Sequence, residues 1–335
     1  MPQQNDPASF DEDIIDRALP IVDPHHHLWD DARGRYVLED LLADVNSGHN
    51  IRATVFVECA AMYRADGEEA MRPVGEVEFV NGTAAMSASG GFGTSRLCAA
   101  IVGHADLRLG DSFEAVLTAM ERAGGSRFRG IRQMTTHDSD VRQHAFPKLM
   151  RDPRFADGLA RLQRRGLHFE AWLYHPQLPD LISVMETQPE ARVVVNHIGG
   201  RIGVGRYVGR QDEVWQAWSR DIATLARYPN CYVKLGGLGM PLCGFGFETR
   251  DTPVGSSELA DAWRPYFEHC IAAFGVQRCM FESNFPVDRV SCSYPAAWNA
   301  FKRIAAGSSA NEKAALFGRT AADLYALPPD VIATL

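Results

Sequence analysis

Two histidines, two positions apart at the end of an apolar run, are the residues of this chain best placed to do chemistry. They are His25 and His27, in the segment Ile21-Val22-Asp23-Pro24-His25-His26-His27-Leu28-Trp29. Alternate side chains on a β-strand share a face, so these two imidazoles should enter one cavity while His26 points the other way. Imidazoles that converge at a strand end hold a divalent metal, or bind and protonate an oxyanion.

Other apolar runs also end in polar residues. Glu58 follows such a run, and a buried carboxylate there needs a metal, a cation or a histidine, unless it reaches solvent at the rim. His175 stands just before a proline, which suits a substrate or metal contact and equally a helix cap. His197 follows three valines and an asparagine, and precedes Gly199-Gly200, where a ligand could approach the backbone.

Two cations complete this set of residues at the ends of apolar runs. Arg132 offers a planar fork that suits a carboxylate or a sulfonate, although an ion pair with an acid on a neighbouring strand is an equal alternative. Lys234 either binds an anion or pairs with Glu58 or Glu282. Glu170 lies deeper in its run and needs a cationic partner if it points inward.

Eight short apolar runs alternate with longer segments of helical periodicity, which predicts parallel strands joined by helices. The expected strands are 20–24, 52–59, 97–103, 128–132, 167–173, 192–197, 230–235 and 278–283. The expected helices are 38–47, 73–88, 111–124, 154–165, 178–187, 211–228, 257–275, 295–305 and 311–325. Eight such units close most simply into an α/β (β/α)₈ TIM barrel. The alternative, an open doubly wound sheet, would carry a glycine-rich phosphate turn after its first strand.

The pattern predicts an N-terminal arm over 1–19 and a single barrel domain over 20–335. In a barrel, the long loops 133–153, 198–210 and 236–256 would surround the active site, because they follow strands.

Composition excludes several classes of protein. The 335 residues are 46% hydrophobic and carry a formal net charge of -8, which argues against a nucleic-acid partner. The chain has no run of about 20 apolar residues that could cross a membrane, and its polar start is not a signal peptide. Seven dispersed cysteines predict reduced thiols in the cytoplasm. An anionic small-molecule substrate stays compatible with this charge, since local arginines can reverse the field in a cleft.

Seven segments, in order along nearly the whole chain, resemble the amidohydrolase superfamily, in the branch of TIM-barrel lactonases. That branch includes sugar lactonases, a pyrone-dicarboxylate lactonase and a sulfomuconolactone hydrolase. The segments are Val22-Asp23-Pro24-His25-His26-His27-Leu28-Trp29, Val57-Glu58, Arg129-Gly130-Ile131-Arg132, Gln177-Leu178, Asn196-His197-Ile198-Gly199, Lys234-Leu235-Gly236-Gly237 and Ser283-Asn284-Phe285-Pro286-Val287.

The resemblance implies roles for individual residues. His25 and His27 match the strand-one pair, which ligates a divalent metal in many members and contacts substrate directly in metal-free ones. His197 matches the histidine that polarises the scissile carbonyl or shuttles a proton. Two histidines are too few for a stable zinc centre, so Glu58 or His175 would complete it, and we expect the metal ligands His25, His27 and Glu58.

The chain departs from the family pattern at the eighth strand. The family usually reads Gly-Ser-Asp-Trp-Pro there, whereas this chain reads Glu282-Ser283-Asn284-Phe285-Pro286. An amide cannot act as a base. Either Asn284 orients water or substrate while Glu282, Asp288 or Glu58 transfers the proton, or the reaction needs no strong base.

These observations lead us to expect a metal-assisted hydrolase, with zinc as the metal, that opens a lactone of a carboxylated small molecule. His197 would stabilise the oxyanion, and the substrate contacts would come from Arg132, His175 and Lys234. A non-oxidative decarboxylase or hydratase of an aromatic or unsaturated acid is the alternative, and Asn284 fits it somewhat better. A barrel that binds a small acid without turning it over is the non-enzymatic alternative. Association into a homo-oligomer is left open.

Overall fold

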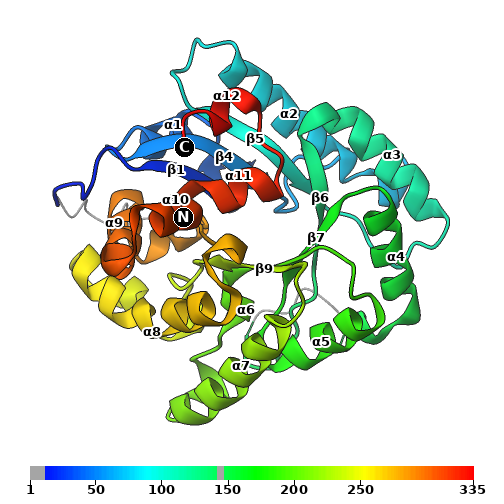
Figure 1. Cartoon of the computed structure of the whole chain (residues 1–335). Coiled ribbons are helices and arrows are strands. Elements are labelled where there is room, and N and C mark those ends of the chain that lie inside the picture. The colour runs from blue at the N-terminus through cyan, green and yellow to red at the C-terminus, as the bar shows by residue number, and fades with distance from the viewer. Residues whose placement is uncertain (1–11, 142–146) are drawn as a thin grey trace.

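A computed structural model describes residues 12–141 and 147–335, and its eight main strands are parallel and closed into a ring. Each strand pairs with the next along the chain, and the colours of Figure 1 pass once around the ring. The strands are β1 (Pro20–His26), β4 (Asn50–Val57), β5 (Arg96–Gly103), β6 (Phe128–Met134), β7 (His168–Trp172), β8 (Val193–Val195), β9 (Cys231–Leu235) and β10 (Cys279–Phe281). The amide of Asn284 donates to the His25 carbonyl at 3.0 Å, and the amide of His27 donates to the Phe285 carbonyl at 2.8 Å. These bonds close the predicted TIM barrel, which is confirmed.

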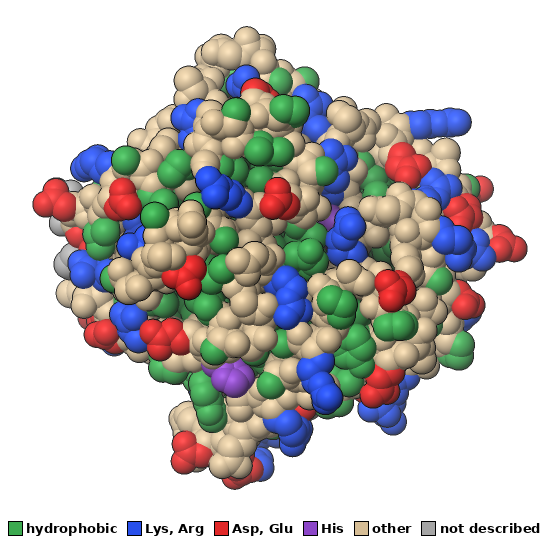
Figure 2. Space-filling view, viewed as in Figure 1, with side chains coloured by type: hydrophobic (Ala, Val, Ile, Leu, Met, Phe, Trp, Pro, Cys, Tyr) green, Lys and Arg blue, Asp and Glu red, His purple; other side chains and the backbone are tan. Residues whose placement is uncertain are grey.

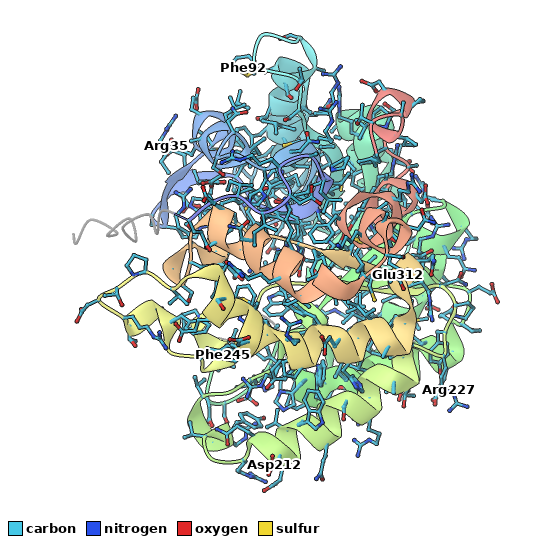
Figure 3. All side chains as sticks on the ribbon, turned by 60° about the vertical axis from the view of Figure 1, so that its left-hand side comes forward. Arg35, Phe92, Asp212, Arg227, Phe245 and Glu312 are labelled. Carbon is cyan, nitrogen blue, oxygen red and sulfur yellow. The ribbon has the colours of Figure 1, made fainter. Side chains whose placement is uncertain are left out.

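Helices lie outside the ring and cover the sheet (Figure 1). They are α1 (Leu38–Val45), α2 (Val74–Ala88), α3 (Ser112–Gly124), α4 (Pro153–Arg164), α5 (Leu178–Thr187), α7 (Gln211–Leu225), α8 (Ser256–Phe274) and α9 (Tyr294–Ile304). Figure 3 shows how densely side chains fill the interior, with Phe92 after α2 and Asp212 in α7 at opposite ends of the molecule. The predicted helices therefore form, with ends shifted by a few residues.

Three local features differ from the prediction. The sixth strand ends at Val195, because His197 and Ile198 take left-handed φ values of 52° and 51° and begin the short α6 (His197–Gly200). The closing helix is divided into α10 (Ala310–Ala314), a π-helical turn (Ala315–Arg319) and α11 (Thr320–Leu324). A hairpin of β2 (Trp29–Asp31) and β3 (Gly34–Tyr36), which the periodicity did not indicate, follows the histidine segment.

The C-terminal segment fills one end of the barrel with apolar side chains. Leu324, Tyr325, Leu327 and Val331, the last from α12 (Pro329–Ile332), pack against residues of the strands. Those strand residues include Val22, Ala53, Val55, Ala100, Val102, Val194 and Met280. In Figure 1, α11 accordingly lies toward the middle of the ring. This apolar floor leaves the carboxyl ends of the strands as the polar end of the barrel.

The outer surface is mixed in charge. Figure 2 shows basic and acidic side chains interspersed over the face that it presents. Across residues 12–141 and 147–335, no helix combines the length and apolar character that a membrane crossing requires. The seven cysteines are all buried and free.

Residues 12–19 of the predicted arm are held against α9. The ammonium of Lys302 donates to the carbonyls of Ile15 and Asp16 at 2.8 and 2.9 Å, and to Nδ1 of His49 at 2.9 Å. Nε2 of His49 in turn donates to the Pro295 carbonyl at 3.1 Å. The His49 imidazole must therefore stay neutral for Lys302 to keep its third bond.

Replacing His49 with glutamine tests the acid sensitivity of this contact. Burial, with Lys302 second, lowers the pKa of His49 from 6.5 to about 4. The stability that this provides is complete above pH 6.5 and is lost as the pH falls toward 4, because the unfolded imidazole takes up a proton first. We expect the native protein to lose up to about 3 kcal/mol more than H49Q over this window, measured by urea unfolding. Parallel pH profiles for the two proteins would contradict the account.

Candidate metal centre at the barrel mouth

Three imidazoles meet at the carboxyl ends of the strands. His25 lies near the end of β1. Its ring centroid is 4.9 Å from that of His27 and 4.6 Å from that of His197. All three residues are buried. His26 points elsewhere, with Nε2 2.8 Å from the Thr54 hydroxyl. His25, His27 and His197 therefore converge on one site, as predicted.

The carboxylate of Glu282 lies between two of these rings. Its Oε1 accepts hydrogen bonds from Nδ1 of His197 at 2.6 Å and from the His197 amide at 3.1 Å. Its Oε2 lies 2.6 Å from Nδ1 of His25, yet this buried oxygen has no partner in hydrogen-bonding geometry. Glu282 thus fixes His197 and presents a second oxygen toward His25.

Two glycines make room for this arrangement. Gly237, with φ of 71°, passes so close to His197 that a Cβ there would lie 2.5 Å from the ring. A Cβ on Gly236 would collide with Glu282 itself. The Gly-Gly pair after β9 therefore lets the backbone approach both side chains closely.

The imidazoles are held in their neutral form. Burial lowers the pKa of His25, His27 and His197, and nearby cations, among them Arg132, lower each of them further. His27 donates from Nδ1 to the Val57 carbonyl at 2.8 Å, and His197 donates from Nδ1 to Glu282. The Nε2 atoms of both rings thus keep lone pairs that can accept a proton or bind a metal.

Glu282, His25 and His197 form a donor cluster that fits a divalent metal. One ligand atom from each residue lies within 4.8 Å of the other two, and among the described residues this is the one such group of three. Two imidazoles and a carboxylate are the protein ligands of many catalytic zinc sites, in which a fourth position stays open. The orphaned Glu282 Oε2 is the structural sign that the cluster has room for a cation.

The donor cluster differs from the predicted ligand set of His25, His27 and Glu58, which stays a prediction. Glu58 Oε1 accepts from Nε of Arg132 at 2.7 Å, and the Glu58 carbonyl also binds this guanidinium. One carboxylate oxygen is thereby paired with a cation from β6, whereas Oε2 is buried without a hydrogen-bond partner. Nη1 of Arg132 lies 3.3 Å from Nε2 of His25, so the ion pair of Arg132 and Glu58 borders the donor cluster without joining it.

Lys234 is buried inside the barrel, below the rim where a substrate would bind. It is fully buried and donates to Glu170 Oε2 at 2.6 Å and to the Pro24 carbonyl at 2.9 Å, with His25 Nδ1 at 3.4 Å. The predicted pairing with Glu58 or Glu282 is wrong, because Glu170 is the partner. Glu170 thus has the cation that a buried carboxylate needs.

His175 lies outside the donor cluster. Its Nδ1 accepts from the Ile202 amide at 3.2 Å, and its ring packs 5.0 Å from Tyr207. Burial, followed by Arg201, lowers its pKa to about 4. His175 therefore joins the loops after β7 and β8, and a contact with substrate stays a prediction.

Asp288 holds the amide of Asn284. Nδ2 of Asn284 donates to Asp288 Oδ1 at 2.7 Å, and the Gly239 amide donates to Oδ2 at 3.0 Å. Burial raises the pKa of Asp288 to about 8. One N–H of the amide is thereby committed, which fixes the orientation of Asn284 and leaves its oxygen as an acceptor for water or substrate.

Two tryptophans that the sequence analysis gave no role flank the imidazoles. Trp172 meets His197 edge-on with centroids 4.6 Å apart, and Trp29 stacks on His27 at 6.2 Å. Trp172 follows Glu170 by two positions and so shares its inward face, which is a signal available from the sequence. These rings shield the imidazoles from water.

A parallel (β/α)₈ barrel that gathers two histidines and a glutamate at the carboxyl ends of its strands defines an enzyme active site suited to a divalent metal.

The chain belongs to the amidohydrolase family, whose model matches residues 22–327. It is 32% identical over 332 residues to an uncharacterized protein from Sinorhizobium fredii, covering 92% of this chain and 98% of the relative. It is also 32% identical over 244 residues to an L-fucono-1,5-lactonase from Burkholderia multivorans, covering 71% of this chain and 74% of that enzyme. The crystal structure of a Burkholderia multivorans amidohydrolase with bound zinc superposes with a TM-score of 0.71 at 25% identity, covering 92% of this chain and 99% of that one.

Two matched variants distinguish the ligand set that the geometry favours, with Glu282, from the set predicted from the sequence, with Glu58. We expect Glu282→Gln to weaken the affinity for zinc more than about 100-fold, because the substitution removes a metal ligand. Substitution of residues that only hydrogen-bond to metal ligands typically costs about 10–100-fold in affinity. Glu58→Gln should leave that affinity within about tenfold, because Glu58 faces Arg132. Competition with a chromogenic chelator measures both. A large loss in E58Q with normal binding in E282Q would restore the predicted set.

Proposed function

We propose that this protein hydrolyses the ester bond of a lactone, with a divalent metal, zinc in the first instance, held by His25, His197 and Glu282. The observation that carries the proposal is the Glu282 carboxylate shared by two neutral imidazoles at the barrel mouth. The lactonase among the relatives supports the choice of a cyclic ester. A bound divalent ion would polarise the ester carbonyl or lower the pKa of water.

The surrounding residues have separate tasks in this proposal. His27, whose Nδ1 is tied to the Val57 carbonyl, can accept a proton or a hydrogen bond at Nε2. Asn284, oriented by Asp288, offers an amide oxygen to a hydroxyl group or to water. Trp29 and Trp172 restrict access of bulk water to the reacting groups.

The charge distribution favours an uncharged lactone over the carboxylated one expected from the sequence. Among the described residues near the mouth, Arg132 is paired with Glu58, Lys234 with Glu170 and Arg206 with Asp138. Each of these three cations already has a carboxylate partner, so none of them offers an uncompensated charge to a substrate anion. Arg201, after α6, is buried without such a partner in the described part of the chain, but its guanidinium bonds the Cys243 carbonyl and packs on Phe245 and Tyr266, and it is not among the cations that act on the three imidazoles. We propose a hydroxyl-bearing neutral lactone as the substrate class.

A panel of paired lactones tests this class. We expect kcat/KM to be at least about tenfold higher for neutral sugar lactones than for ring-matched lactones bearing a carboxylate, since burying an unpaired anion costs more than burying hydroxyls. Ring opening is followed by acid release in a pH-indicator assay. Preference for the carboxylated member of each pair would return the substrate to the class expected from the sequence.

Non-oxidative decarboxylation of an aromatic acid is the second candidate. Asn284 favours it, because an amide at the end of the eighth strand supplies no base and decarboxylation needs no hydrolytic base. Release of carbon dioxide from aromatic acids, without turnover of any lactone, would select this alternative.

Replacing His197 with alanine tests the proposed centre. We expect kcat to fall at least about 100-fold, the usual scale for losing one group that acts on the transition state. His269→Ala serves as the control, because His269 lies on α8 and contacts the Ser219 carbonyl. A loss under threefold in a folded H197A protein would remove His197 from the mechanism.

A further inference from the structure

A column of buried polar side chains runs from the floor of the barrel to the metal centre. Tyr325 donates its hydroxyl to Glu170 Oε1 at 2.5 Å, and Lys234 donates to Glu170 Oε2 at 2.6 Å. The Lys234 ammonium also lies 3.4 Å from Nδ1 of His25. Tyr325, Glu170 and Lys234 are all fully buried. The column therefore links the residue that directly follows α11 to the first strand.

Glu170 is the branch point of this column. Besides Tyr325 and Lys234 it accepts from Nδ2 of Asn196 at 2.8 Å. Asn196 directly precedes His197, and Lys234 binds the carbonyl of Pro24, which directly precedes His25. One carboxylate thus holds the backbone next to two of the three members of the donor cluster.

Tyr325 is itself held firmly at the floor. Nε of Arg129 donates to the Tyr325 carbonyl, and Nη2 donates to the Ala326 carbonyl at 3.0 Å. The tyrosine ring also lies 5.4 Å from the Lys234 ammonium and 5.1 Å from the His168 ring. Glu170 Oε1 has no other hydrogen-bond donor nearby except His168 at 3.5 Å among the described residues. Without the phenol, this oxygen would lose its one short hydrogen bond.

We propose that Tyr325 is a positioning residue, which through Glu170 fixes Lys234 and Asn196 and so sets His25 and His197 for the reaction. The inference rests on the proposed function only in taking those two histidines as its working groups. The C-terminal segment would then orient the active-site histidines as well as pack against the floor of the barrel. Tyr325 touches neither substrate nor metal.

Tyr325→Phe removes one hydroxyl and tests the proposal with Thr320→Val as its matched control. Thr320 lies on the same α11 and donates to the Val276 carbonyl at 2.9 Å, away from the column. Nitrogen-15 NMR of labelled histidine side chains, with His25 and His197 assigned from single variants, reports directly on the two rings. We expect the His25 and His197 signals to shift in Y325F and to stay in place in T320V. Unchanged signals in Y325F would overturn the proposal, whether or not any lactone is turned over.

Activity and metal affinity give the second readout. We expect Y325F to lower kcat and zinc affinity about tenfold each, with KM changed less than twofold, as is typical when a residue behind the ligands is altered. Arg129→Gln, which frees the backbone of Tyr325 without touching the barrel interior, should shift the same NMR signals in the same direction. Equal losses in Y325F and T320V would show a general effect of the floor and would contradict the positioning role.

Discussion

The structure depends on one buried carboxylate placed between two imidazoles. Glu282 comes from the end of the last strand, whereas His25 and His197 come from the first and sixth. The cluster can form only if the barrel closes, because β10 must come beside β1. The same closure is made by the backbone bonds from Asn284 to His25 and from His27 to Phe285. Fold and site are thus specified by the same residues, and a chain that failed to close would lose both.

Electrostatic pairing explains why the other charged residues lie where they do. A buried ion without a partner is costly, and the interior meets this constraint with Arg132 beside Glu58 and Lys234 beside Glu170. These pairs surround the donor cluster without entering it. The imidazoles are consequently buried beside positive charges that are already paired, which keeps them neutral and able to bind a cation or accept a proton.

The sequence was sufficient to predict the barrel, because eight apolar runs alternate with helical periodicity, and to place His25, His27 and His197 together, because each follows such a run. The sequence was not sufficient to predict which charged groups pair with one another or with the histidines. Period two tells which side chains share a face but not how deep each lies. The sequence therefore favours Glu58 as the metal ligand and Glu282 as a proton-transferring group, whereas the structure brings Glu282 beside His25 and Arg132 beside Glu58. The role of Tyr325 was out of reach, since its partner Glu170 lies 155 residues away. Substrate specificity cannot be predicted from the sequence pattern, because it depends on long rim loops whose conformations the pattern does not determine.

Anomalous X-ray scattering at the zinc edge, from crystals of the native protein grown with zinc, tests the central claim most directly. The account predicts one strong peak at the barrel mouth, within about 2.0–2.2 Å of a nitrogen of His25, a nitrogen of His197 and an oxygen of Glu282. A peak bound instead by Glu58 and His27, or crystals in which zinc leaves this pocket empty while Glu282 and the two imidazoles point apart, would contradict it.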